Sequence, residues 1–466
     1  MNSQRPAFLL TAFLLAAITA PGALAQSGQD GLRVAATRVD ITHGTEDVRP
    51  SAVEYEHERL YLRAIVIDNG ASRAVLIGAD LGGIADEVWD DASKRIAAKL
   101  NIPVANIIIS STHTHSDTPA SETPGPGVAR FGTDFVADVA LQAVTDAMQR
   151  LEPALMGYST GEAYLNVNRD AVNPDTHLWT QATNLDGSSD KTVAVVSFVR
   201  PDGTPVAAYV NYAIHPVSGY LAGFQSGDFA GATSRYVEQA FGDRMVTVFS
   251  QGASGDQNPR WLRTGTNAMA SRSGAAITGY EMVREDIEAP LRSRAVAAKD
   301  IDPEIKRQLA GYMQAQGIIL GEEVIRVMSD TEHSAVAAEI WGKQTMLTCP
   351  GRRRLDSGRE GMAGEYEDGD DVGIRLGVLA IGDIAFGTAA GEIYSKIGLR
   401  VKQESPLSKT LLVTLANGRG TTGYVPDDES FGHRTFQVLG TRLKPGCAES
   451  GIASAIASLL GEYLAQ

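Results

Sequence analysis

Three histidines have the types and the spacing that could do chemistry in this sequence. His113 and His115 follow an apolar run, and His215 follows a second apolar segment that ends at Ile214. If the first strand continues through the pair, both imidazoles point to one side, where they could share a metal or a substrate. The alternatives are a pair of turn histidines that satisfy nearby carbonyls, and a structural histidine at position 215.

A carboxylate would complete a metal site. Glu392, at the start of a predicted helix, could join His113 and His215 in the N,N,O set that catalytic zinc favours, with one position left open for water or substrate. The sequence has no H-E-x-x-H helix, which excludes the thermolysin arrangement. The segment from His113 to Asp117 begins like the H-x-H-x-D-H of two-metal hydrolases, but Thr118 stands in the closing position. The pattern therefore favours a single metal ion.

Alternating strands and helices are predicted to position these side chains. In chain order we expect a strand at 74–79, a helix at 86–100, a strand at 107–110, two strands within 192–214, a helix at 228–241 and a strand at 246–250. The first three elements form a β-α-β unit, in which ligands sit beyond the carboxyl ends of the strands. His113 and His215 both fall at such a strand end.

The rest of the chain completes a mixed α/β pattern. We expect a packed helix at 305–327 rather than an exposed lid, because amphipathic spacing mostly reflects a core. Strands are predicted again at 374–387 and 410–416. The predicted fold class is α/β, with mixed sheets flanked by helices in one catalytic domain over residues 26–466.

The first 25 residues read as a secretory signal peptide. Their apolar run is followed by Ala23-Leu24-Ala25, a small-residue pattern that predicts cleavage after Ala25. No later segment approaches the length needed to span a bilayer. We therefore expect an exported chain, periplasmic or secreted, which could still touch a membrane surface transiently.

The charge balance and the cysteine content restrict the kinds of partner and site that the chain can have. The chain has 56 Asp and Glu against 41 Lys and Arg, a balance that disfavours nucleic acid as a partner and favours a neutral or small substrate. Its two cysteines, Cys349 and Cys447, have no zinc-type spacing. One disulfide and two buried thiols are both compatible with the sequence.

Eight motifs spread over almost the whole chain resemble those of the neutral/alkaline non-lysosomal ceramidase family, in the family's order. They are Ala36-Thr-Arg-Val-Asp40-Ile-Thr42, Gly78-Ala-Asp80-Leu-Gly82, Ser111-Thr-His113-Thr-His115-Ser, Asn166-Val-Asn168-Arg169 with Asn173-Pro174, Ser226-Gly-Asp228, Gly255-Asp256, Gly391-Glu392 and Gly423-Tyr424-Val. The resemblance implies the family's catalytic domain and a hydrolase that cleaves an N-acylated amide. The ceramide-like reaction would convert N-acylsphingosine and water into a fatty acid and a sphingoid base.

The resemblance also implies roles for particular residues. One Zn²⁺ per chain would be held by four side chains: His113, His215, Glu392 and Tyr424. His115 and Arg169 would polarise the substrate carbonyl and stabilise the oxyanion that forms on attack. The zinc would lower the pKa of a bound water to about 7, making that water the nucleophile at neutral pH.

Three departures from the family pattern bear on the substrate. Asn258 stands where the family has a serine in G-D-x-S-P-N, so that it could hydrogen-bond the substrate or stabilise a turn but not act as a nucleophile. Phe436 stands where the family has a second tyrosine, and the immunoglobulin-like module that follows the family's catalytic domain is not expected here. A zinc hydrolase acting on a smaller amide, peptide, lactone or ester is therefore an alternative, as is a zinc-containing binding protein without turnover.

Overall fold

The computed structural model describes residues 31–42, 58–117, 133–219, 225–260, 303–334, 338–358, 360–418 and 422–466. The expected signal peptide, residues 1–25, lies outside these ranges. Among the helices within them, none is long and apolar enough to cross a membrane.

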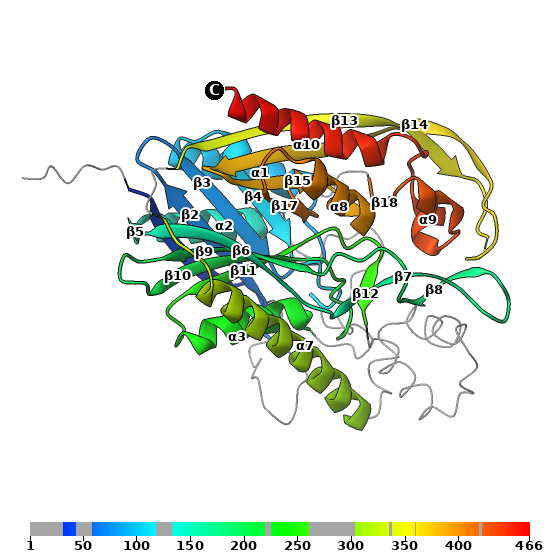
Figure 1. Cartoon of the computed structure of the whole chain (residues 1–466), viewed down its shortest axis with the longest axis horizontal. Coiled ribbons are helices and arrows are strands. Elements are labelled where there is room, and N and C mark those ends of the chain that lie inside the picture. The colour runs from blue at the N-terminus through cyan, green and yellow to red at the C-terminus, as the bar shows by residue number, and fades with distance from the viewer. Residues whose placement is uncertain are drawn as a thin grey trace, which may run out of the picture.

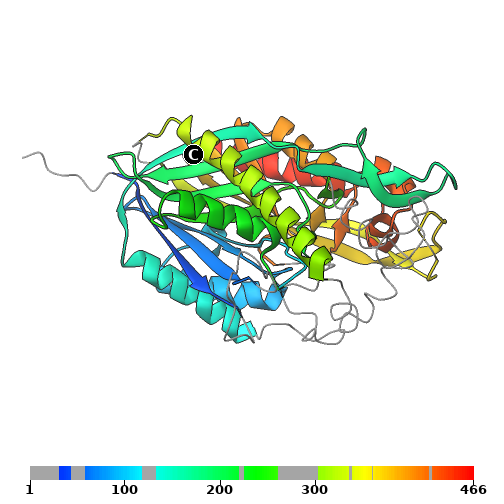
Figure 2. The ribbon, with the colours of Figure 1, turned by 90° about the horizontal axis from the view of Figure 1, so that it is seen from below.

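The first of three large sheets has the strand order β4-β3-β2-β1-β5. Its strands are β1 (Arg33–Asp40), β2 (Tyr61–Asp68), β3 (Arg73–Ala79), β4 (Ile107–Ser111) and β5 (Glu152–Pro153). Strands β3 and β4 pair in parallel, and α1 (Asp86–Leu100) connects them. This β-α-β unit confirms the sequence prediction. Helices α1 and α2 (Thr133–Met148) cover the outer face of the sheet, and the short η1 (Val104–Asn106) leads into β4 (Figure 2).

The second sheet has the order β11-β10-β9-β6. Its strands are β6 (Leu155–Glu162), β9 (Thr192–Val199), β10 (Pro205–Tyr212) and β11 (Val246–Gln251). Helices α3 (Asp228–Ala240) and α7 (Pro303–Ser329) pack against each other and cover its outer face, below the sheet in Figure 1. Leu320 and Val324 of α7 are fully buried, which confirms a packed helix in this region.

The third sheet has the order β13-β14-β15-β17. Its strands are β13 (Ile340–Arg354), β14 (Tyr366–Ile381), β15 (Ile384–Ala389) and β17 (Lys409–Thr414), covered by α8 (Ser395–Glu404) and α10 (Ala448–Leu464). The strand region predicted at 374–387 is thus two strands, separated by a turn at Gly382, whose φ is 59°. The sequence did not predict β13, which contains Pro350 and Gly351, two residues that disfavour a regular strand. In the structure they lie at a register shift in its pairing with β14.

The inner faces of all three sheets meet in one apolar core. Ile65 from the first sheet, Tyr209 from the second and Phe386 from the third belong to a single buried cluster. The rings of Tyr209 and Phe386 pack edge to face, with their centres 5.4 Å apart. The architecture is therefore mixed α/β, with helices on the outside of sheets that share a core, as the sequence predicted.

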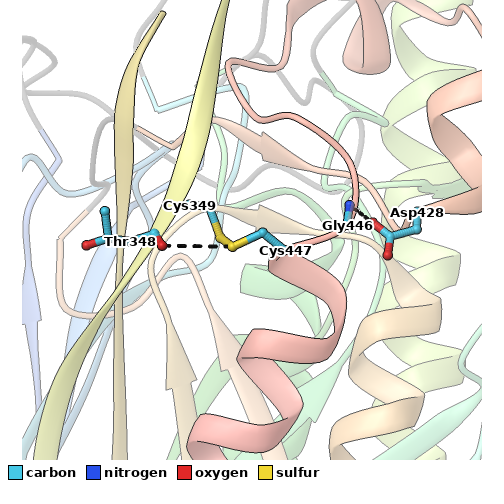
Figure 3. Close-up of a disulfide and its surroundings, with 5 residues drawn as sticks. All are labelled: Thr348, Cys349, Asp428, Gly446 and Cys447. Atoms are coloured by element: carbon cyan, nitrogen blue, oxygen red, sulfur yellow. Dashed lines mark hydrogen bonds between the residues drawn. A yellow bond between two sulfur atoms is a disulfide. The ribbon is translucent and has the colours of Figure 1, made fainter.

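A disulfide joins the third sheet to its covering helix. Cys349 in β13 and Cys447, immediately before α10, are bonded, with their Cα atoms 5.7 Å apart (Figure 3). This pairing decides between the two states that the sequence left open. Next to it, the Gly446 amide donates to the Asp428 carboxylate at 2.6 Å and fixes the turn before α10.

Two small sheets complete the molecule near the ends of the large ones. One contains β12 (Gln257–Pro259), β7 (Asn166–Val172) and β8 (Trp179–Asn184); the other pairs β16 (Glu392–Ile393) with β18 (Tyr424–Val425). The short helices η5 (Glu429–Gly432) and α9 (Phe436–Gly440) follow β18. Every residue proposed from the sequence for the site lies in one of these small sheets or just beyond the end of a large-sheet strand.

Candidate functional site

His113 lies just after β4, where the chain makes a sharp turn. The strand ends at Ser111, and His113 has a φ of 64°, in the left-handed region that few residues other than glycine adopt. The histidine pair is therefore not part of a continuing strand, although the turn still brings both imidazoles to the same place. The Nδ1–H of His113 donates to the Gly82 carbonyl at 2.6 Å, which leaves its Nε2 free to act as a ligand.

His215 lies just after β10 and is fully buried. Its Nδ1 contacts two backbone carbonyls, Ser254 O at 2.8 Å and Gln257 O at 3.0 Å, so that Nδ1 carries the proton and Nε2 a lone pair. Burial lowers the pKa of His215 to about 4, which keeps the imidazole neutral at neutral pH.

Glu392 brings a carboxylate oxygen to both imidazoles. Its Oε2 lies 3.3 Å from His113 Nε2 and 3.1 Å from His215 Nε2. Burial alone would raise the pKa of Glu392, but its interactions with the two histidines hold that pKa well below its usual range. The N,N,O set inferred from the sequence is therefore assembled in the structure.

The spacing of these three atoms fits a metal ion. Donors bound about 2.0–2.1 Å from a tetrahedral ion are about 3.3 Å apart, close to the separations between Oε2 and the two Nε2 atoms. With both Nδ1 atoms donating to carbonyls, the Nε2 lone pairs of His113 and His215 face an ionised carboxylate. Acceptors that face one another at this distance are stabilised by a cation between them, either a shared proton or a metal ion. The residues present therefore fit a bound metal ion.

Tyr424, the fourth ligand that the family resemblance implies, lies beside this set. It pairs directly with Glu392 across the parallel β16–β18 sheet, and its ring stacks on that of His215 with the centres 6.5 Å apart. Burial and the nearby Glu392 carboxylate raise the pKa of Tyr424 well above its ordinary value. A cation would act in the opposite direction, since it favours the phenolate.

His115 packs against both other histidines. Its ring centre is 4.9 Å from that of His113 and 5.8 Å from that of His215. Nitrogen atoms of the three rings lie within 4.8 Å of one another, so that a three-histidine metal set is a second geometric possibility. Burial lowers the pKa of His115 well below its ordinary value, which leaves a neutral imidazole. The same ring can therefore serve as a ligand or as a hydrogen-bond donor.

Arg169 is buried at the edge of the same site, on β7. The pairing of β7 with β8 shifts register between Asn168 and Asp170, and such bulges re-aim the side chain at the extra residue. The guanidinium donates to Gly255 O at 2.5 Å and to Asn258 Oδ1 at 3.3 Å. Its central carbon lies 5.4 Å from the centre of the Tyr424 ring.

Asn258 and Phe436, the two residues that depart from the family pattern, both contact this arginine. Asn258 lies in β12 rather than in a turn, and its carbonyl oxygen faces Arg169. The ring of Phe436 lies 5.4 Å from the Arg169 guanidinium carbon and meets the Tyr424 ring edge to face. The site therefore presents apolar surface at the position where the family has a hydroxyl.

Some residues that hold the site were not identified as such from the sequence. Asp117 accepts from the Gly82 amide, and Asp256 accepts from Ser395 and Asn168. Gly82 and Asp256 both belong to the motifs quoted above, so a signal was present. Their role depends on contacts between distant segments, which the motifs do not reveal.

Comparison with known proteins agrees with the motifs. Residues 55–282 match the model of the family described as neutral/alkaline non-lysosomal ceramidase, N-terminal. The fold is similar to a crystal structure of neutral ceramidase from Pseudomonas aeruginosa, at 17% identity and a TM-score of 0.63, over 92% of this chain and 73% of that one. It is also similar to a structure of ceramidase complexed with C2, at 18% identity and a TM-score of 0.62, over 92% and 74% of the two chains.

Proposed function

We propose that this chain, whose residues 55–282 match the model of the neutral/alkaline non-lysosomal ceramidase family, is a zinc-dependent hydrolase that cleaves the amide bond of an N-acylated, ceramide-like substrate. The products would be a fatty acid and a sphingoid base. One Zn²⁺ would be held by His113, His215, Glu392 and Tyr424.

The observation that carries this proposal is the triangle of facing acceptors. Glu392 Oε2 lies 3.1–3.3 Å from two Nε2 lone pairs, and both histidines use their Nδ1–H on backbone carbonyls. This supports a zinc-type site of two nitrogens and one oxygen, with the Tyr424 phenol next to it. The neutral His215 and the ionised Glu392 are the states in which these groups bind a metal.

A bound zinc would supply Lewis acidity and lower the pKa of its water to about 7. Arg169 and His115 would then stabilise the negative charge that develops on the substrate carbonyl oxygen. Hydrolysis would add the oxygen of a water molecule to the carbonyl carbon and break the carbon–nitrogen bond, and the amine would leave with a proton from that water. Two hydrogen bonds, to Gly255 O and Asn258 Oδ1, orient the Arg169 fork before any substrate arrives.

The residues beside Arg169 bear on whether the substrate is a lipid amide or a smaller amide or ester. The edge-to-face packing of Phe436 on Tyr424, with Arg169 beside both rings, gives the site an apolar wall that suits an acyl chain. The same wall lacks the hydroxyl that the family pattern places there, which favours substrates with a more reactive carbonyl. A smaller amide or an ester is therefore the second candidate.

One preparation can test the function and separate the candidates. Purified protein would be offered a short-chain N-acylsphingosine, a small N-acyl amide and an ester with the same acyl group, each with and without a zinc chelator. We expect chelator-sensitive release of fatty acid from the N-acylsphingosine, with activity restored by Zn²⁺. Turnover of only the small amide or the ester would replace the lipid substrate by the second candidate. Bound zinc without turnover of any substrate would indicate a binding protein.

We further propose that residues 26–466 act as one catalytic unit and that the chain is exported after removal of residues 1–25. The core shared by the three sheets supports the first point. The bond between Cys349 and Cys447 supports the second, because disulfides persist mainly in oxidising compartments. N-terminal sequencing of the protein from its native host would test the export proposal, with Gln26 expected as the first residue.

A further inference from the structure

The two histidines closest to Glu392 are oriented by backbone carbonyls that lie on loops or in the short β12. Gly82 follows the end of β3, Ser254 lies between β11 and β12, and Gln257 is the first residue of the short β12. A ligand histidine that donates its other ring N–H has its tautomer and ring orientation fixed by that bond. The positions of these carbonyls therefore determine where the two Nε2 atoms point.

Asp117 fixes the position of Gly82, whose carbonyl accepts the hydrogen bond from His113. It is buried, and its Oδ2 accepts from the Gly82 amide at 2.9 Å, while the Gly82 carbonyl accepts from His113 Nδ1 at 2.6 Å. A Cβ on Gly82 would lie 3.1 Å from Thr114 O and 3.4 Å from Asp117 Oδ2. The segment that carries His113 thus packs closely against Gly82, and the hydrogen bond from the Gly82 amide to Asp117 holds the two segments together.

Asp256 holds the carbonyls that serve His215. It is buried between Ser254 and Gln257 in the chain, and its carboxylate accepts three hydrogen bonds at 2.8 Å: from Ser395 N, Ser395 Oγ and Asn168 Nδ2. The neighbouring Gly255 amide donates to Ile393 O at 2.8 Å. These contacts tie the loop behind His215 to the segment that starts with Glu392 and to the strand that carries Arg169.

We propose that Asp117 and Asp256 are positioning residues for the metal site, which fix His113 and His215 through the backbone carbonyls that these histidines use. The proposal rests on the metal-binding function proposed above. In this proposal neither aspartate is a metal ligand. Each acts on one histidine, and Asp256 also sets the distance between His215 and Glu392.

The test is metal affinity, measured separately from turnover. The dissociation constants of Zn²⁺ and Co²⁺ would be measured by competition with a chromophoric chelator for wild type, Asp117→Ala, Asp117→Asn and Asp256→Ala, together with the visible spectrum of bound Co²⁺. We expect each Ala variant to bind about 10–100-fold more weakly, with an altered Co²⁺ spectrum. Asp117→Asn retains an oxygen that can accept from the Gly82 amide, so it should restore most of the affinity.

Asp68 offers a matched control. It is a buried aspartate that accepts from the amide of Gly70 at 2.7 Å, as Asp117 does from Gly82, and it lies at the far end of β2 next to Arg73. Asp68→Ala should lower stability and leave metal affinity unchanged. An equal loss of affinity in Asp68→Ala and Asp117→Ala would overturn the proposal, because it would show a general effect of stability.

A milder variant keeps the test open if the Ala variants do not fold. Ser395→Ala removes one of the three donors to Asp256 and leaves its backbone N–H in place. We expect a smaller loss of affinity from it. Wild-type affinity in Ser395→Ala, or in a folded Asp117→Ala, would overturn the proposal and leave the metal site intact. A wild-type protein that binds neither metal would overturn the proposed function as well.

Discussion

The guanidinium carbon of Arg169 lies 5.4 Å from the centre of the Phe436 ring and the same distance from the centre of the Tyr424 ring. The cation is therefore held between two aromatic side chains at the edge of the candidate metal site. One ring carries a hydroxyl and the other does not. In the proposed reaction, this difference would determine how much of the oxyanion stabilisation depends on the arginine itself.

Replacement of Arg169 tests its role in the reaction. Arg169→Ala should lower kcat by about 10²–10³-fold, the typical cost of losing one oxyanion donor, while zinc content stays at the wild-type level. Arg169→Lys keeps the positive charge but loses the two-pronged hydrogen-bonding geometry of the guanidinium. Its kcat should lie between those of the wild type and Arg169→Ala. Steady-state kinetics and elemental analysis of each variant check this. An equal loss of bound zinc would assign Arg169 to the structure of the metal site instead.

Restoring the missing hydroxyl should increase the rate. Phe436→Tyr places an O–H donor on a ring that already contacts Tyr424 and faces Arg169. We expect kcat on the N-acyl amide to rise by roughly 10-fold, less than the full effect of a donor in a site preorganised for it. Phe436→Leu serves as the matched control, since it changes the ring without adding a donor. A fall in kcat for Phe436→Tyr would show that the apolar wall itself is what the substrate requires.

The disulfide should contribute measurably to stability. Cys349 and Cys447 are 98 residues apart in sequence, and bonds that close long loops restrict the unfolded chain most. We expect the double variant Cys349→Ser, Cys447→Ser to lose about 2–5 kcal/mol of unfolding free energy, measured by urea denaturation. Reducing agent should destabilise the wild type to the same extent and leave the double variant unaffected. Two titratable thiols in the native protein would contradict the observed pairing.

One buried carboxyl predicts a pH dependence of stability. Burial raises the pKa of Asp228, at the start of α3, from 3.8 to about 6. The folded state therefore binds this proton more tightly than the unfolded state, so the contribution of Asp228 to the unfolding free energy falls as pH rises from about 4 to 6. Above that range the contribution is constant.

The variant Asp228→Asn should remove this dependence. Asparagine tolerates the positive φ of 55° at this position. Relative to wild type, the variant should gain up to about 3 kcal/mol between pH 4 and pH 6, measured by urea unfolding in the presence of chelator. A stability difference that does not change with pH would mean that Asp228 ionises normally in the folded protein.

The sequence predicted the elements that carry His113 and His215 because their strands are continuous apolar runs bounded by clear turn residues. It also indicated Glu392, Tyr424, Arg169 and Asn258 through motifs. The structure places Glu392 against both histidines, Tyr424 against His215, and Asn258 against Arg169. The turn at His113, with its positive φ, could not be predicted, since local sequence favours continuation of the strand. The partners of Asp117 and Asp256 could not be predicted either, because their contacts join segments that meet only after the sheets have packed.

The most direct test of the account is a comparison of two histidines with the same unusual backbone. His113 and His177 have φ angles of 64° and 59°, and His177 is exposed. Asparagine tolerates this region, so His113→Asn and His177→Asn change the backbone strain equally, and only the first removes a predicted ligand. Zinc content and amide hydrolysis would be measured on the same preparations. We predict that His113→Asn loses both and that His177→Asn retains both; full zinc and full turnover in His113→Asn would contradict the proposed metal site.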